Sequence, residues 1–162
     1  MSFRDKVDKV LESLLVFTLG ILVIDVLWQV LSRYMLSAPS KFTDELAGFL
    51  LMWVTLLGAA YATGKRQHLA LGLMKSKLSG DNLKRIELSI HVITTIFAVG
   101  VMIIGGSWLI ITRFYLGQIS AVLQVPIGYV YMVLPISGIF IIYYSIANAF
   151  EDWNKKQLYK SL

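Results

Sequence analysis

The costliest residue in this sequence is an aspartate inside a long apolar run. Asp25 is followed by Gln29 and Arg33 at intervals of four residues, with Ser32 beside them, so these side chains share one side of a helix. A carboxylate at the centre of a membrane helix is unfavourable by about 2.5–3.5 kcal/mol. The stripe could bind a proton or a cation, it could pack against another helix or subunit, or Asp25 could lie nearer the interface. No second acidic residue stands at that depth, which favours packing.

Two further acids, Asp44 and Glu45, stand at the start of the next apolar run. Ser40 or Thr43 can cap a helix that begins there, and acidic residues in a first turn complement the helix dipole. We expect the two acids to serve the start of that helix. A docking contact on the outer side of the membrane is the alternative.

His68 and His91 are the two histidines of the chain, and both are expected near the same membrane face. Such a pair could ligate haem, as in membrane anchors of oxidoreductases, but no further ligand or quinone-site pattern accompanies it. The absence of cysteine excludes disulfides, thiolate metal sites and thiol nucleophiles. No nucleophile–base pair, phosphate loop or metal-ligand spacing occurs either. We therefore expect no catalytic residue, substrate site, metal or cofactor in this chain.

Small residues give two of the apolar runs a smooth side, which permits close helix approach in lipid. They are Gly58, Ala59, Ala60 and Ala62 in one run, and Gly100, Gly105 and Gly106 in the other. Three tryptophans fall near predicted membrane interfaces, where this residue is a typical anchor: Trp28, Trp108 and Trp153. Trp53 lies deeper, so we expect it to serve packing or a subunit contact.

The elements that must position these residues are membrane-spanning helices. Hydrophobic residues make up 57% of the 162 residues and charged residues 15%, against about a quarter charged in a typical soluble domain. Four runs are long enough, or nearly so, to span the hydrocarbon core as helices: residues 10–31, 46–63, 88–112 and 125–150. We predict an all-α integral membrane protein with four transmembrane helices in a single domain.

The connections carry signals of their own. Residues 3–14 and 71–78 show apolar positions at helical spacing between charges, which predicts short interfacial helices. The connection after the third span is too apolar to be fully exposed to water, and we expect it to contact the membrane or a partner. Pro126 suits the first turn of the last span, and Pro135 should kink that span.

Basic residues predict the orientation. The N-terminal tail, the connection between spans two and three, and the C-terminal tail hold three, six and three Lys or Arg, whereas the other two connections together hold three. Both termini should therefore be cytoplasmic. The net charge of +5 is explained by this asymmetry, so we expect no nucleic-acid partner. The first apolar run is long enough to span and no cleavage site is evident, so we expect a retained span and not a signal peptide.

Several short motifs resemble one known family. They are Arg33-Tyr34, Phe42-x-x-Glu45-Leu46, Trp53, Leu57-Gly58-Ala59-Ala60, Arg66-x-His68-Leu69-x-Leu71, Gln124-Val125-Pro126, Tyr131 and Leu134-Pro135. With the length and the four spans, they resemble the small membrane subunit (DctQ-like) of tripartite ATP-independent periplasmic (TRAP) transporters. One position departs: Gly72 stands where the family often has an acidic residue, so no role for that carboxylate carries over.

The resemblance implies a function that composition alone does not. Systems of this family import organic acids, including C4-dicarboxylates and sialic acids, driven by a sodium gradient in the bacterial inner (cytoplasmic) membrane. A periplasmic binding protein captures the substrate, a large membrane subunit moves it as an elevator, and the small subunit braces the static scaffold. The implied partners are these two proteins and membrane lipids. The candidate interface or docking residues are then Asp25, Gln29, Arg33, Glu45, Trp53, Gly58, Arg66 and His68.

Two other functions stay open. The chain could be a membrane anchor of an oxidoreductase that holds haem or quinone, or a small autonomous transporter that works as a homodimer. A transporter acting alone needs broken helices or buried polar groups near the midplane. Spans two to four are almost wholly apolar at that depth, which favours a subunit that works with a partner.

Overall fold

The computed structural model describes residues 3–35, 40–65 and 81–160, and most of them are helical. Within these ranges, four helices are long and apolar enough to cross a membrane: Arg4–Met35, Lys41–Gly64, Leu88–Tyr115 and Ile127–Phe150. The predicted all-α fold with four spans is confirmed. All four helical spans continue past a predicted bound, because polar residues at the ends of the apolar runs also adopt helical structure.

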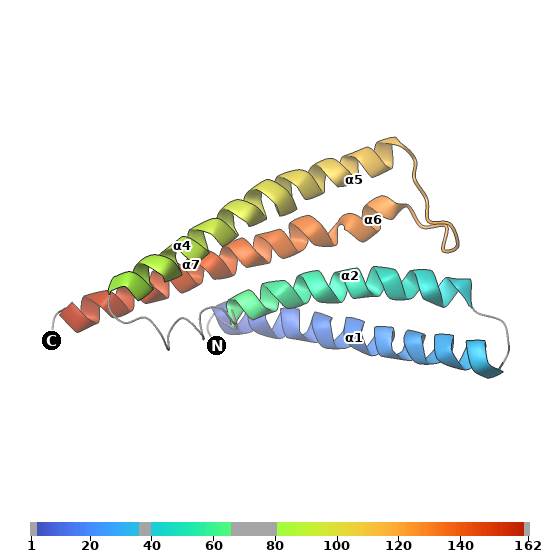
Figure 1. Ribbon diagram of the computed structural model, residues 1–162, viewed down its shortest axis with the longest axis horizontal. Coiled ribbons are helices and arrows are strands. Elements are labelled where there is room, and N and C mark those ends of the chain that lie inside the picture. The colour runs from blue at the N-terminus through green and yellow to red at the C-terminus, as the bar shows by residue number, and fades with distance from the viewer. Residues whose placement is uncertain (1–2, 36–39, 66–80, 161–162) are drawn as a thin grey trace.

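The first span is the helix α1 (Phe3–Met35), and it runs antiparallel to α2 (Lys41–Gly64) (Figure 1). Less exposed positions of α1 recur at alternating intervals of three and four residues: Asp8, Leu11, Leu15, Thr18, Leu22, Asp25, Gln29 and Ser32. A spacing that averages 3.5 residues keeps one side of a helix against a neighbour, as in a coiled coil. We call this line of contact between α1 and α2 the seam. The interfacial segment expected at residues 3–14 is the first part of α1, with no break before the span.

Helix α2 begins with a capping residue. The Ser40 hydroxyl accepts a hydrogen bond from the N–H of Thr43 at 3.4 Å, and the Thr43 hydroxyl donates to the Ser40 carbonyl at 3.0 Å. These bonds occupy groups that a helix start otherwise leaves without partners. Of the two candidate caps, Ser40 is the one used.

The third span changes its helical geometry half-way. It begins as α4 (Asp81–Phe97), continues as the π-helical stretch η1 (Ala98–Gly105) and ends as α5 (Gly106–Tyr115). The wider turns of a π-helix let residues four apart stay on one side. Accordingly Ala98, Met102 and Gly106 are all buried, and all lie against the last span.

The last span is broken near its start. The short helix α6 (Ile127–Tyr131) and the long helix α7 (Val133–Lys160) are separated at Met132. Pro135 explains the break, because it lacks the N–H that would bond the carbonyl of Tyr131 and its ring crowds that carbonyl. The break thus lies beside the proline that was expected to kink this span. Pro126 is the N-cap residue of α6, one position before the first turn in which it was expected.

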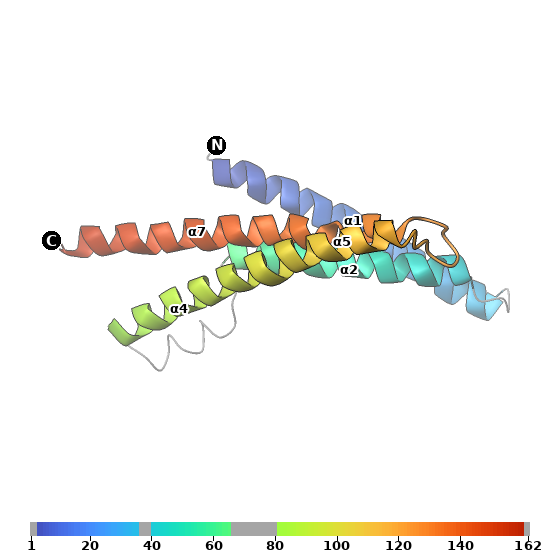
Figure 2. The same ribbon diagram turned by 90° about the horizontal axis from the view of Figure 1, so that it is seen from above.

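The four spans lie in a row. Helix α2 packs between α1 and α7, and α7 packs between α2 and the third span. Figure 1 shows the row face-on, and Figure 2 shows the helices fanning apart toward the chain termini, so the row is twisted. In the most apolar part of the last span 39% of residues are buried, and in that of the first span 11%. Most of the apolar surface is therefore left for lipid or for other proteins.

Candidate functional site

Hydrogen bonds join neighbouring helices at each end of α2. At its C-terminal end, the guanidinium of Arg4 in α1 donates to the carbonyl of Gly64 at 2.8 Å and to the side-chain oxygen of Asn148 in α7 at 2.9 Å. The amide of Asn148, which is 1% exposed, donates to the carbonyl of Thr63 at 2.9 Å. The last carbonyls of a helix have no partner within it. Here α1 and α7 supply donors for them.

A second set of bonds lies beside the first. Asp8 in α1 accepts from the ammonium of Lys65 at 2.7 Å and from the hydroxyl of Tyr144 in α7 at 2.6 Å. The hydrogen bond to Asp8, with the negative charge of that carboxylate, raises the pKa of Lys65 above its usual value, so the ammonium stays charged at physiological pH. The Tyr144 ring covers Gly64, where a Cβ would lie 2.7 Å from it. We call Arg4, Asp8, Lys65, Tyr144 and Asn148 the C-terminal tie of α2.

At the other end of α2, one carboxylate binds three backbone amides. An oxygen of Glu45 accepts from the N–H of Ala121 at 3.1 Å, and the other accepts from Val122 at 3.0 Å and Leu123 at 2.9 Å. These amides belong to the α5–α6 loop. We expected Glu45 to serve the start of α2; this was wrong, because its side chain reaches across to the loop. We call this contact the N-terminal tie.

The α5–α6 loop has a defined conformation. Ile119 and Pro126 form an antiparallel bridge, and two residues in the left-handed region make the turns: Gly117 with φ 58° and Gln124 with φ 55°. Several apolar side chains on the loop are nevertheless exposed: Leu116, Ile119, Val122 and Val125. The loop therefore presents an apolar surface that the Glu45 carboxylate holds in place.

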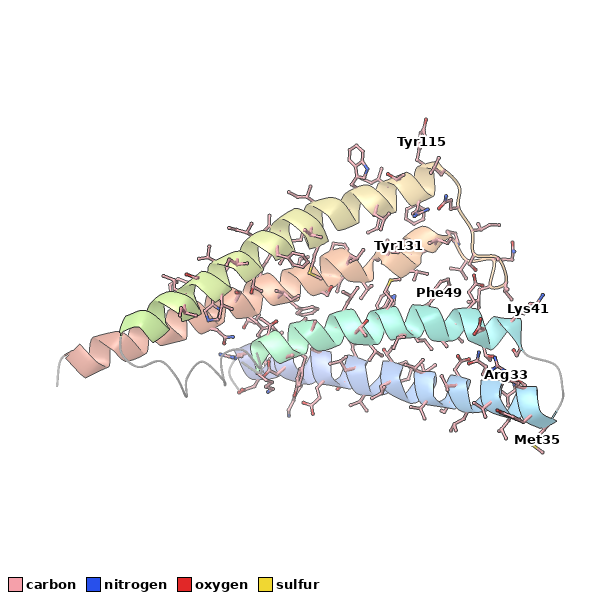
Figure 3. All side chains as sticks on the ribbon, viewed as in Figure 1. Arg33, Met35, Lys41, Phe49, Tyr115 and Tyr131 are labelled. Atoms are coloured by element: carbon pink, nitrogen blue, oxygen red, sulfur yellow. The ribbon has the colours of Figure 1, made fainter. Side chains whose placement is uncertain are left out.

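The polar stripe of α1 lies in the seam with α2. Asp25 is 7% exposed, and the Gln29 amide donates to Asp44 at 2.7 Å. One carboxylate oxygen of Asp25 is buried without a hydrogen-bond partner among the described residues. Arg33 is exposed near the end of α1, where Met35 and Lys41 also lie (Figure 3). The stripe thus packs within the chain, except for Arg33.

Trp53 and Gly58 both face other helices of the same chain. The indole N–H of Trp53 donates to the carbonyl of Val130 in α6 at 3.1 Å, which links α2 to the broken part of the last span. A Cβ on Gly58 would lie 3.9 Å from the Leu15 side chain, so this glycine is in the seam. Both residues therefore contribute to packing inside the chain.

Glycines bring the third and last spans close together. A Cβ on Gly106 would lie 2.9 Å from that of Leu134, and a Cβ on Gly138 would lie 3.0 Å from that of Met102. Neither position has room for a larger side chain unless the helices move apart. Gly100, expected on the same smooth side as Gly106, faces open space instead.

One of the two histidines, His91, lies among the described residues. Among the described residues, no group of three or more His, Asp or Glu could hold a metal ion. His91 is 8% exposed, and its backbone carbonyl accepts from the hydroxyl of Ser145 in α7 at 3.2 Å. Arg66, His68 and the interfacial helix expected at 71–78 lie outside the described residues.

The C-terminal tie was not found from the sequence. The sequence pattern of the basic members Arg4 and Lys65 predicts only the membrane orientation. No pattern predicts a contact for Asp8. A signal was present in the last span, where polar side chains repeat on one helical side. All four are buried: Ser137, Tyr144, Ser145 and Asn148. A polar line of this kind in an apolar helix indicates a protein-facing side.

Comparison with known proteins agrees with this architecture. Residues 22–155 match the family described as "Tripartite ATP-independent periplasmic transporters, DctQ component". The chain belongs to the DctQ family. A Haemophilus influenzae relative named "Putative TRAP transporter small permease protein" is 26% identical over 137 residues, covering 83% of this chain and 82% of that protein. The sialic acid TRAP transporter small permease protein SiaQ of Vibrio cholerae is 24% identical over 148 residues, covering 91% of this chain and 84% of that protein.

Membership of the DctQ family gives the chain a place and a general role. DctQ proteins are the small permease subunits of TRAP systems, which also contain a large membrane subunit and a periplasmic binding protein. With four helices able to span a membrane, this chain is a multi-pass protein of the bacterial inner membrane. The resemblance seen in its motifs is thereby confirmed.

Proposed function

We propose that this chain is the non-catalytic scaffold subunit of a sodium-coupled TRAP transporter that imports organic acids of the C4-dicarboxylate or sialic acid type. The observation that carries the proposal is the open row of helices, which leaves most of each span uncovered within the chain. A row of this kind suits a brace laid along a larger membrane protein. The sialic acid named for the Vibrio cholerae relative supports that substrate class.

The large membrane subunit is the proposed partner inside the bilayer. Long apolar side chains on the third span are exposed: Ile93 at 66%, Ile104 at 63% and Ile111 at 67%. On this proposal, the large subunit and lipid share these surfaces. DctQ membership favours this function over a haem-binding anchor or an autonomous homodimeric transporter.

The apolar α5–α6 loop is the proposed contact for the periplasmic binding protein. Glu45 acts indirectly there, because its carboxylate is engaged by loop amides and fixes the loop. Charge at Val122, which is 40% exposed, should weaken docking. We expect Val122→Lys to raise the concentration of binding protein that gives half-maximal uptake, while Lys41→Gln leaves it unchanged. An unchanged value in Val122→Lys contradicts the docking role.

This placement requires both termini to be cytoplasmic, as the basic residues predict. The absence of native cysteine allows a direct test. Ala121→Cys should react with a membrane-impermeant maleimide in intact spheroplasts, and Ser76→Cys only after the membrane is opened. The opposite pattern reverses the topology.

Reconstitution tests the transport role. The large subunit is placed in proteoliposomes with and without this chain, together with the binding protein, an inward sodium gradient and labelled sialic acid or C4-dicarboxylate. We expect uptake only when both membrane subunits and sodium are present. Full uptake by the large subunit alone would show that the brace is dispensable.

A further inference from the structure

A groove on α1 places a lysine beside an apolar surface. It has a volume of about 520 Å³ and is lined by Lys9, Val10, Ser13, Leu14 and Phe17. The three apolar members are well exposed, at 56%, 43% and 68% for Val10, Leu14 and Phe17. They follow Lys9 along the helix toward the centre of the span, so the groove is cationic at its outer end and apolar further in.

The groove lies on the side of α1 that faces away from α2. The seam uses Asp8, Leu11 and Leu15, whereas the groove positions fall between them on the opposite side of the helix. Lys6, which is exposed, precedes Lys9 by three residues and stands one turn away on the groove side. The groove therefore ends in two neighbouring ammonium groups.

Three acids stand near the two lysines: Asp5, Asp8 and Glu12. Asp8 is bound by Lys65 and Tyr144 in the C-terminal tie. Asp5 and Glu12 are helical neighbours of Lys9 and lie between the groove side and the seam side of α1. Lys6 and Lys9 are both exposed, and a long lysine side chain can reach the headgroup level while its stem covers apolar surface.

We propose that this groove is a binding site for an anionic phospholipid, whose phosphate is held by Lys6 and Lys9 and whose acyl chain lies over Val10, Leu14 and Phe17. Complementary charge selects the anionic headgroup, and the apolar lining selects a lipid over a free anion. The Ser13 hydroxyl, between the lysines and the apolar part, can donate to a phosphate or glycerol-ester oxygen. The site makes no use of the transport function proposed above.

Native mass spectrometry of the complex purified in mild detergent tests the site. Phosphatidylglycerol and phosphatidylcholine with identical acyl chains are added, and the bound copies are compared. Each lysine near an anionic lipid surface contributes about five-fold in affinity, so the double variant Lys6→Gln/Lys9→Gln should lower phosphatidylglycerol binding by about 25-fold. Phosphatidylcholine binding should stay unchanged, and Lys41→Gln, at the other end of the hairpin, should have no effect.

The apolar half needs its own variant. Leu14→Asn/Phe17→Asn should weaken both lipids, and inorganic phosphate should not displace bound phosphatidylglycerol. Equal binding of the two lipids by the native chain overturns the proposal, as does an unchanged preference in the lysine variant. Displacement by phosphate alone would mean a simple anion site. A photo-crosslinker at position 17 that captures only the large subunit would mean that protein, and not lipid, covers the groove.

Discussion

Replacing Asn148 by leucine tests whether the neighbours of α2 stabilise its C-terminal end. The two side chains have the same number and branching of heavy atoms, so the substitution removes the hydrogen bonds and keeps the branched shape. It deletes a bond from the charged donor Arg4, worth about 1.5–3 kcal/mol, and a neutral bond to Thr63, worth about 0.5–1.5 kcal/mol. The two bonds together are worth about 2–4.5 kcal/mol, and since polar contacts in membranes measure toward the low end, we expect a loss of about 2 kcal/mol.

The loss can be measured by unfolding the purified chain in mixed micelles of mild detergent and dodecyl sulfate. The fluorescence of its four tryptophans reports the packing between helices, and the midpoint should move to lower dodecyl sulfate. Thr55→Val is the matched control. Thr55 is exposed and its hydroxyl bonds only carbonyls of its own helix, at 2.7 and 3.0 Å, so its midpoint should not move.

A double-mutant cycle separates direct from indirect effects. Arg4→Leu and Asn148→Leu, alone and combined, should show a coupling energy of about 1 kcal/mol, because the two side chains are in direct contact. If Asn148→Leu unfolds at the same midpoint as Thr55→Val, or if the two effects are simply additive, the reasoning about this tie is refuted.

Three further substitutions test other contacts. Glu45→Gln removes the charge that holds the loop amides, so a cysteine at Val122 should be labelled faster; an unchanged rate argues against the tie. Gly106→Leu should lower the yield of folded chain in size-exclusion chromatography, because its Cβ would meet Leu134, whereas Gly100→Ala, in open space, should not. Trp53→Phe keeps an aromatic side chain, although a smaller one, and loses the N–H bond to Val130, so it should destabilise the fold by at least about 1 kcal/mol; a wild-type midpoint excludes that contribution.

The four spans were predictable because hydropathy and helix length act within one segment of the chain. The break in the last span was predictable for the same reason, since Pro135 acts on a carbonyl four residues away. The stretch from Ala98 to Gly105 was expected as an ordinary helix. It is π-helical and contacts α7 through Ala98 and Met102, and a local sequence pattern contains no information on such contacts.

The ties at the ends of α2 were not predictable in the same way. Arg4 and Asn148 are separated by 144 positions, and only the order of helices in the row brings them together. Glu45 was a candidate, but its partners are backbone amides, which every residue except proline carries and which leave no mark in the sequence. The Asp25 stripe predicted which side of α1 packs against a neighbouring helix. It did not show whether that helix belonged to the same chain.

The two ties lie near opposite ends of α2, and from Glu45 to Lys65 the helix rises by about 30 Å at 1.5 Å per residue. Helices that are hydrogen-bonded at one end only can move apart at the other end. Helices that contact each other only through apolar side chains can shift along their axes, because such contacts are not directional. Fastened at both ends, the α1–α2 pair and the rest of the row resist shear along the membrane normal. A row of helices that resists shear in this way can keep its position in the membrane when a neighbouring protein moves.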